Sequence, residues 1–129
     1  MQVSISRALH TKLLALAAAE PTCEVCGLLF GTAERIEGIE PCTNVAAQTE
    51  TSFEIDPLAL IAAHKRERAG GPAIIGCYHS HPNGVEALSP HDLAQSEQGS
   101  IWAIAAGGRL CFWQIELPSA KSLAVRFNE

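Results

Sequence analysis

One segment in the middle of the chain restricts the fold more than any other: a sharply bounded helix that leads directly into a short apolar strand. Asp56-Pro57 predicts where the helix begins, because aspartate is a good N-cap and proline suits the first helical position. Gly70-Gly71-Pro72 predicts its end, and residues 73–78 (Ala-Ile-Ile-Gly-Cys-Tyr) are apolar almost throughout. A strand of this kind is buried on both faces, which requires further layers of structure on either side of its sheet.

The rest of the chain supplies those layers by alternating strands with helices. Two more helices are predicted, over residues 6–19 and from Ser89-Pro90 to about Gln98. The other strands are predicted at residues 3–5, 25–30, 35–40, 101–106, 110–115 and 123–127, with a polar loop over 41–52. This interleaving predicts a layered α/β domain with a mixed sheet, and at 129 residues the whole chain, 1–129, is expected to be one domain.

Charge and hydropathy argue against nucleic-acid and membrane partners. The net charge is −5, and no basic run exceeds Lys65-Arg66 followed by Arg68, so the chain has no electrostatic footprint for a phosphate backbone. The longest apolar run near the start, residues 13–19, is far shorter than the ~20 residues of a membrane span, and its leucines recur at helical spacing. Five cysteines, an odd number in a chain large enough to fold without disulfides, are typical of a reducing cytoplasm.

The residues that carry chemistry are concentrated in His79-Ser80-His81-Pro82 and, after six intervening residues, Ser89-Pro90-His91-Asp92. Residues i and i+2 of an extended chain point to the same side, so His79 and His81 present two imidazoles together at the end of the buried strand. Asp92 lies one turn into the next helix, and the loop is long enough to bring that helix start back over the histidines. Two nitrogens and one carboxylate oxygen are the three protein ligands that leave a zinc ion one open position for water.

Three features of the sequence have simpler interpretations. Ser89 and Asp92 also match a helix-capping pattern, which is compatible with a metal site because capping would hold Asp92 in place. His91 is not expected to be a ligand, since adjacent helical residues point about 100° apart. Cys23 and Cys26 form a C-x-x-C pair, but redox pairs of this spacing cap a helix, whereas these fall on a predicted strand and face opposite sides.

A hydrolytic site also needs a base and a group that stabilises a developing oxyanion. Ser89 is a candidate for the second role. Glu24, at the start of the predicted strand Glu-Val-Cys-Gly-Leu-Leu, is a candidate for the first, although spacing alone does not distinguish it from the other glutamates.

The pattern His-x-His-Pro, six residues, Ser-x-x-Asp resembles the signature of the JAMM (MPN-plus) zinc metalloproteases, and residues 24–31 (Glu-Val-Cys-Gly-Leu-Leu-Phe-Gly) resemble the glutamate strand of that family. Asn44 and residues 53–57 (Phe-Glu-Ile-Asp-Pro) are weaker similarities, so the resemblance extends over residues 24–92. It implies a three-layer α/β/α sandwich with a mixed central sheet, related to the cytidine deaminases.

The same resemblance implies a role for each site residue and one Zn²⁺ per chain. The zinc ligands would be His79, His81 and Asp92. Glu24 would activate the zinc-bound water as general base and then act as general acid, and Ser89 would stabilise the tetrahedral intermediate. Zinc can lower the pKa of bound water from 15.7 to about 7, which makes such hydrolysis possible at neutral pH.

The resemblance further implies a substrate class: the amide or isopeptide bond after the C-terminal Gly-Gly of a ubiquitin-like or sulfur-carrier protein of the β-grasp fold. The length of the chain fits the small bacterial-type members of the family. The chain is too short to contain the long insertions with which larger relatives recognise a polyubiquitin linkage. The alternative is a non-catalytic MPN-type interaction scaffold, but scaffolds of this fold lack the ligand set that is complete here. A zinc deaminase would need His-x-Glu and Pro-Cys-x-x-Cys, and neither occurs.

Overall fold

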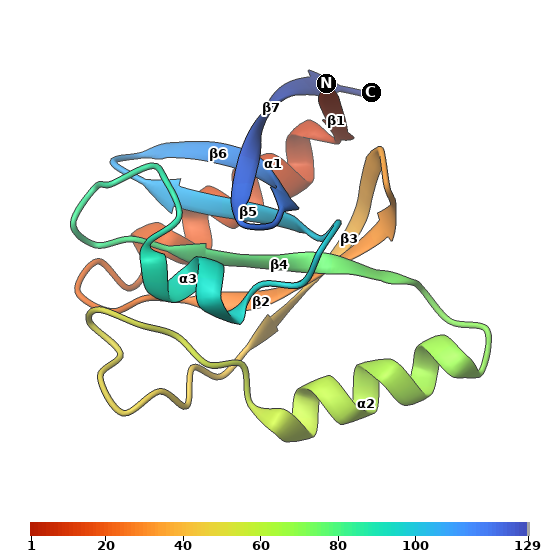
Figure 1. The fold of residues 1–129 in the computed structure, drawn as a ribbon, viewed down its shortest axis with the longest axis horizontal. Coiled ribbons are helices and arrows are strands. Elements are labelled where there is room, and N and C mark those ends of the chain that lie inside the picture. Colours follow the sequence, from red (N-terminus) through yellow and green to blue (C-terminus); the bar gives the residue numbers. More distant parts are fainter. Residues whose placement is uncertain (129) are drawn as a thin grey trace.

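The computed structural model describes residues 1–128 and contains every predicted element (Figure 1). The order is β1 (Gln2–Ile5), α1 (Arg7–Ala18), β2 (Cys26–Thr32), β3 (Arg35–Cys42), α2 (Pro57–Arg68), β4 (Ile74–Ser80), α3 (Pro90–Gln95), β5 (Ile101–Ala106), β6 (Arg109–Glu116) and β7 (Ser119–Phe127). None of the helices described over residues 1–128 is long and apolar enough to cross a bilayer.

Two element boundaries differ from the prediction by more than two residues. Strand β7 begins at Ser119 and not at Leu123, because its polar first residues pair with β6 through the backbone, with Ser119 opposite Glu116. Helix α3 ends at Gln95 and not near Gln98: Ser96 adopts an extended backbone, and its hydroxyl donates a hydrogen bond to the Leu93 carbonyl at 2.8 Å.

The seven strands form one mixed sheet in the order β1-β3-β2-β4-β5-β6-β7. Strand β4 lies in the middle, antiparallel to β2 and parallel to β5. Strand β1 runs parallel to β7 at one edge and meets β3 through a single residue pair, Ser4 with Arg35, so the curled sheet closes on itself. The predicted α/β class with a mixed sheet is therefore confirmed. The sheet curves until its first and last strands meet, whereas an α/β/α sandwich is usually built on an open sheet.

A helix packs on each face of this sheet and forms a separate apolar core with it (Figure 1). Alternate residues of the strands supply the two cores, as a pleated strand requires. On the α1 face, Leu13 packs with Leu29, Tyr78 and Ala103. On the α2 face, Ala63 packs in a cluster that contains the preceding residue of each strand, namely Leu28, Cys77 and Trp102.

The centre of the sheet is tightly packed where β4 meets β5. A Cβ atom on Gly76 would lie 1.7 Å from the carbonyl oxygen of Ile101, so only glycine permits this approach. At its other end, β4 pairs with the start of β2, with His79 opposite Cys26. The predicted chemistry therefore lies where a central strand ends beside the beginning of its neighbour.

Candidate metal centre

Three side chains meet at the C-terminal end of β4 and form a compact triangle of potential metal-ligand atoms. His79 belongs to β4 and His81 follows it directly, so both rings lie on one side of the chain. Nε2 of His79 lies 3.0 Å from Nε2 of His81 and 3.1 Å from Oδ2 of Asp92. The third distance, from Nε2 of His81 to Oδ2 of Asp92, is 3.2 Å. All three residues are buried. The structure thus brings together the three residues that the sequence predicts as ligands.

Asp92 reaches this position because of the way α3 begins. Ser89 is the N-cap of α3: its hydroxyl accepts a hydrogen bond from the Asp92 backbone N–H at 3.0 Å, and its own N–H donates to Oδ2 of Asp92 at 2.9 Å. This reciprocal capping box confirms the capping interpretation of the motif. It also directs the carboxylate inward, while His91 beside it is exposed.

The hydrogen bonds of His81 indicate which of its nitrogens is free. Its Nδ1 lies 2.7 Å from the backbone carbonyl of Val85, and because a carbonyl only accepts hydrogen bonds, Nδ1 carries the proton. In the neutral ring, Nε2 therefore presents an unprotonated lone pair to the triangle. An acceptor behind the ring is the usual support for a metal-bound histidine.

The distances between the three ligand atoms, as well as their chemistry, suit a bound metal ion. Two ligand atoms bound 2.0–2.1 Å from one tetrahedral zinc ion lie about 3.3 Å apart, close to the 3.0–3.2 Å sides of the triangle. The carboxylate of Glu24 also has an oxygen within 4.8 Å of ligand nitrogens of both histidines. A buried Glu–His–His group of this kind is compatible with a metal ion.

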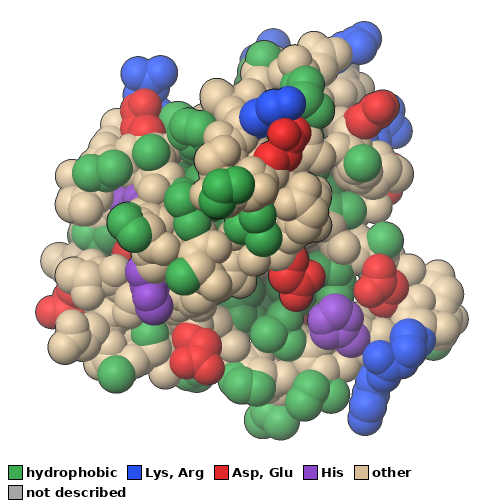
Figure 2. All heavy atoms as spheres, in the orientation of Figure 1, with side chains coloured by type: hydrophobic (Ala, Val, Ile, Leu, Met, Phe, Trp, Pro, Cys, Tyr) green, Lys and Arg blue, Asp and Glu red, His purple; other side chains and the backbone are tan. Residues whose placement is uncertain are grey.

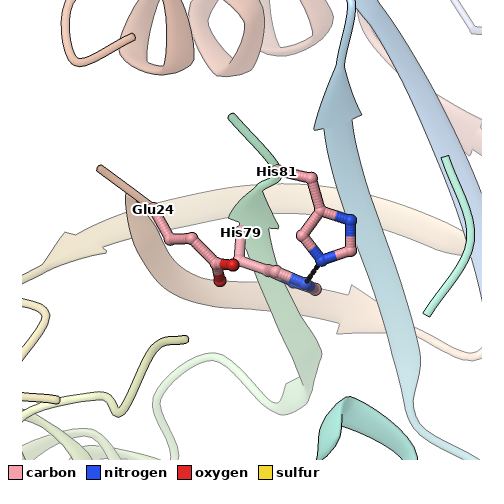
Figure 3. Close-up of side chains that lie close together, drawn as sticks. All are labelled: Glu24, His79 and His81. Carbon is pink, nitrogen blue, oxygen red and sulfur yellow. Dashed lines mark hydrogen bonds between the residues drawn. The ribbon is translucent and has the colours of Figure 1, made fainter. Parts of the chain in front are cut away.

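Glu24 lies just before β2 with its carboxylate directed toward His79 (Figure 3). The residue is only 5% exposed, and its Oε1 has no hydrogen-bond partner among the described residues. A buried carboxylate oxygen without a partner costs free energy, which is typical of a functional group and not of a structural one. Burial raises the pKa of Glu24 to about 7; the nearby His81 lowers it and Asp92 raises it.

The triangle also shifts the pKa values of its own members. Burial alone would raise the pKa of Asp92, but the hydrogen bonds from His79 and His81 outweigh it and hold that pKa well below its usual range. Burial lowers the pKa of His79, which Asp92 only partly offsets. Burial also acts to lower the pKa of His81, but in the protonated ring both nitrogens donate hydrogen bonds, to Asp92 and to the Val85 carbonyl, and these raise the pKa overall. The metal-free cluster thus combines an ionised Asp92 with a neutral His79.

Aromatic rings support His79 from behind. The ring of Phe53 stacks on His79 with centroids 4.4 Å apart and planes 23° apart, and Trp102 meets His79 edge-on at 5.4 Å. Phe53 and Trp102 also line a groove of about 590 Å³ between α2 and the segment that joins α3 to β5. Figure 2 shows this hollow, with apolar side chains at its base and acidic and histidine side chains around it. One aromatic wall therefore separates the groove from the triangle.

Sequence reasoning identified neither Phe53 nor Trp102 as part of the site, nor the carbonyl of Val85. Asn44, in the polar loop, and Phe53, before the second helix, were noted only as weaker similarities, and both lie next to the site. A backbone carbonyl such as that of Val85 carries no signal in the sequence at all.

The C-x-x-C pair forms no disulfide, because all five cysteines are free. Strand β2 begins at Cys26, so Cys23 lies before it and not on the strand as predicted. Burial raises the pKa of Cys26 to about 12, which makes its thiol unreactive. Cys26 lies in the apolar core on the α2 face of the sheet.

The fold and the site together define a class: an α/β domain that carries a buried two-histidine, two-carboxylate cluster at the end of a central strand. More specifically, the chain belongs to the family of prokaryotic homologs of the JAB domain, which matches residues 6–116. The predicted membership of the JAMM/MPN-plus family is thereby confirmed.

Relatives with assigned names are similar over part of the chain. A desampylase of Haloferax volcanii is 37% identical over 78 residues, which are 59% of this chain and 56% of that protein. A probable TtuB-protein conjugate cleaving protease of Thermus thermophilus is 37% identical over 73 residues, 57% of this chain and 49% of that protein. A histone deubiquitinase of Branchiostoma floridae is 32% identical over 93 residues, 67% of this chain but 11% of that protein. The matched segment spans about half the length of the first two relatives and a small part of the third.

Solved structures share the fold over almost the whole chain. The solution structure of a protein from Desulfitobacterium hafniense superposes with a TM-score of 0.82 at 22% identity, covering 99% of this chain and 94% of that one. The crystal structure of a JAB1/MPN domain protein from Archaeoglobus fulgidus gives a TM-score of 0.60 at 17% identity, covering 97% and 98%. At these identities the likeness establishes the fold alone.

Proposed function

We propose that this chain is a zinc-dependent peptidase or isopeptidase that hydrolyses the amide bond after the C-terminal Gly-Gly of a ubiquitin-like or sulfur-carrier protein of the β-grasp fold. The observation that carries the proposal is the buried, unpaired oxygen of Glu24 beside the triangle of His79, His81 and Asp92. A domain that only docked partners would gain nothing from burying such groups together. We further propose that residues 1–129 act as one domain, in the cytoplasm.

In this proposal His79, His81 and Asp92 hold the zinc ion. Two imidazole nitrogens and one carboxylate oxygen are a common catalytic zinc set, and three protein ligands leave one position for water or substrate. Bound zinc would polarise the scissile carbonyl and make water more acidic. The capping box of α3 directs Asp92 at the histidines, and the hydrogen bonds with those histidines keep it ionised.

Glu24 is the proposed proton carrier. It accepts a proton from the attacking water and later delivers it to the amine of the leaving group, so that one carboxylate serves as base and then as acid. The pKa of about 7 that burial gives Glu24 is close to the value at which both transfers are efficient. Positioned acid–base catalysis of this kind is worth roughly 10²–10⁴ in rate.

Ser89 is the proposed stabiliser of the developing oxyanion. Its hydroxyl oxygen is used as an acceptor by the Asp92 N–H, which leaves its O–H free to donate. A single donor to an oxyanion is worth roughly 10²–10³ in rate. Ser89 would thus serve both the structure of the site and its chemistry.

The substrate class rests on the family and on the names of the relatives. Two of the three relatives described above are named for cleaving protein conjugates, one as a conjugate cleaving protease and one as a deubiquitinase. Those names support a ubiquitin-like partner for this chain.

The test is the intact mass of a β-grasp carrier with a peptide extension after its Gly-Gly, or with an isopeptide-linked partner, after incubation with the zinc-loaded protein. The expected result is cleavage at the terminal glycine by wild type and by Glu50→Gln, which changes an exposed glutamate. Glu24→Gln should bind zinc and leave the substrate intact, and a chelator should stop the reaction. Zinc-loaded wild type that cleaves none of the carriers and isopeptide conjugates tried, or purified protein without bound metal, would favour the scaffold alternative.

A further inference from the structure

The polar loop between β3 and α2 is organised around one side chain, the amide of Asn44. Its Nδ2 donates to the backbone carbonyls of Glu24 at 2.9 Å and Ser52 at 3.1 Å. Its Oδ1 accepts from the backbone N–H groups of Ala46 at 3.0 Å and Glu54 at 3.1 Å. An amide has two N–H groups and two acceptor sites, so all four of its hydrogen-bonding positions are used.

One side of this network holds the segment that carries Glu24. Glu24 precedes β2 and so lacks the ladder hydrogen bonds of a strand. Its carbonyl is held by Asn44, and its N–H donates to the carbonyl of Thr49, in the same loop, at 2.7 Å. The next residue, Val25, is held by Ser80, whose hydroxyl accepts from the Val25 N–H at 2.8 Å. The backbone on both sides of the Glu24 side chain is therefore tied down by contacts distant in the sequence.

The other side of the network holds the ring that supports His79. Asn44 bonds to Ser52 and Glu54, the two neighbours of Phe53, and pairs with Ile55 in an isolated β-bridge. Phe53 is thereby fixed against His79, with ring centroids 4.4 Å apart. Nδ1 of His79 has no hydrogen-bond partner among the described residues, so this imidazole is oriented by the aromatic rings packed against it together with the contacts of its Nε2 in the triangle.

We propose that Asn44 is a positioning residue: it sets the carboxylate of Glu24 relative to the His79 and His81 nitrogens by tying both groups to one rigid loop. This inference rests on the proposed function for its catalytic consequence, but its structural half can be tested without any substrate. Asparagine suits the task because it is short and offers two donors and two acceptor sites in one plane. Aspartate has no N–H to give to the carbonyls of Glu24 and Ser52.

The experiment compares Asn44→Asp and Asn44→Ser with wild type. The aspartate keeps the shape and removes both donors; the serine removes the amide without adding charge, so agreement between the variants excludes an effect of charge alone. Asn128→Asp is the matched control, because Asn128 is exposed near the far end of the chain. Three kinds of measurement are made: backbone amide exchange at Glu24 and Glu54, zinc affinity by competition with a chelator, and steady-state kinetics (kcat and KM) on the carrier substrate.

We expect both Asn44 variants to exchange the Glu24 amide at least tenfold faster than wild type and to retain zinc affinity within about threefold. The Glu54 amide should exchange faster in Asn44→Ser alone, because aspartate keeps the oxygen that accepts from the Glu54 N–H. Small displacements at a site can cost on the order of 100-fold in rate, so kcat should fall by roughly 10- to 100-fold with KM nearly unchanged. Asn128→Asp should match wild type in every measurement. If Asn44→Asp does not fold, the milder Asn44→Ser decides.

Three results would overturn the proposal: unchanged amide exchange, a rise in KM with kcat preserved, or a loss of zinc affinity as large as the loss of kcat. Failure of the proposed function would look different. In that case wild type itself would not turn over the substrate, and amide exchange and zinc affinity would still decide whether Asn44 holds the segment of Glu24.

Discussion

Replacing Glu24 by glutamine should stabilise the metal-free protein while removing its activity. The wild-type carboxylate is buried, and one of its oxygens has no partner among the described residues, so ionising it in the folded state is unfavourable. Glutamine has nearly the same shape and no charge to bury. The stabilisation should therefore depend on pH, because only the ionised carboxylate carries the penalty.

The magnitude follows from the pKa of Glu24, which burial raises from its ordinary 4.5 to about 7. An acid that is weaker in the folded state binds protons more tightly there, so stability falls as pH rises from 4.5 to 7 and the full penalty is present above 7. At about 1.4 kcal/mol for each tenfold change in acidity, the penalty at pH 8 is about 3 kcal/mol, and less than 1 kcal/mol of it is present at pH 5. We therefore expect a difference of about 2 kcal/mol between the two pH values.

The assay is urea unfolding of wild type and Glu24→Gln at pH 5 and pH 8, with metal removed and a chelator present. The quantity of interest is the stability gained by the substitution at pH 8 minus the gain at pH 5. The general pH dependence of the fold is common to both proteins and largely cancels in this double difference. Glu50→Gln, at an exposed position, should give a double difference near zero.

The reasoning would be refuted by a gain that is equal at the two pH values, or by a Glu24→Gln protein that is less stable than wild type at pH 8. Either outcome would mean that the Glu24 carboxylate is stabilised in the folded protein by a partner, which would weaken its assignment as a base.

Two further predictions concern the cap of α3 and the thiols. Ser89→Ala should lower the free energy of unfolding by about 1 kcal/mol, because the Asp92 N–H loses its acceptor, and urea unfolding that shows no loss would contradict the capping role. In the folded protein at pH 8, iodoacetamide should modify the partly exposed Cys23 first and leave Cys26 and Cys77 unmodified, because burial raises the pKa of both of those thiols. Timed intact-mass measurements with peptide mapping check this, and labelling of Cys26 as fast as Cys23 would disprove it.

The elements of the fold could be predicted because their signals are local. Asp56-Pro57 and Ser89-Pro90 mark helix starts by capping chemistry that acts within one turn, and the structure has both caps. The start of β7 was missed for a physical reason: Ser119 joins the sheet through backbone hydrogen bonds to β6, which do not depend on its side chain. The curvature that closes the sheet rests on one pair between β1 and β3, and no pattern in either strand indicates it.

The metal-site triangle was accessible from the sequence to different degrees. His79 and His81 share a face because alternate residues of any extended chain do, and Asp92 was indicated by the capping motif that directs it. Glu24 was singled out only by resemblance to a family, because its position beside the histidines depends on the pairing of β2 with β4. The contact between Val25 and Ser80 at this junction joins residues that are fifty-five positions apart in the sequence.

By itself, the sequence determined which residues could form ligands, a cap and a base, because residue type and short-range spacing follow from the chain alone. Tertiary structure decided how these groups face one another. It buried the carboxylate of Glu24 and raised its pKa, placed Phe53 and Trp102 behind His79, and supplied the Val85 carbonyl that leaves Nε2 of His81 free. These are effects of desolvation, ring packing and backbone hydrogen bonds between distant segments, and they exist only once the sheet has brought those segments together.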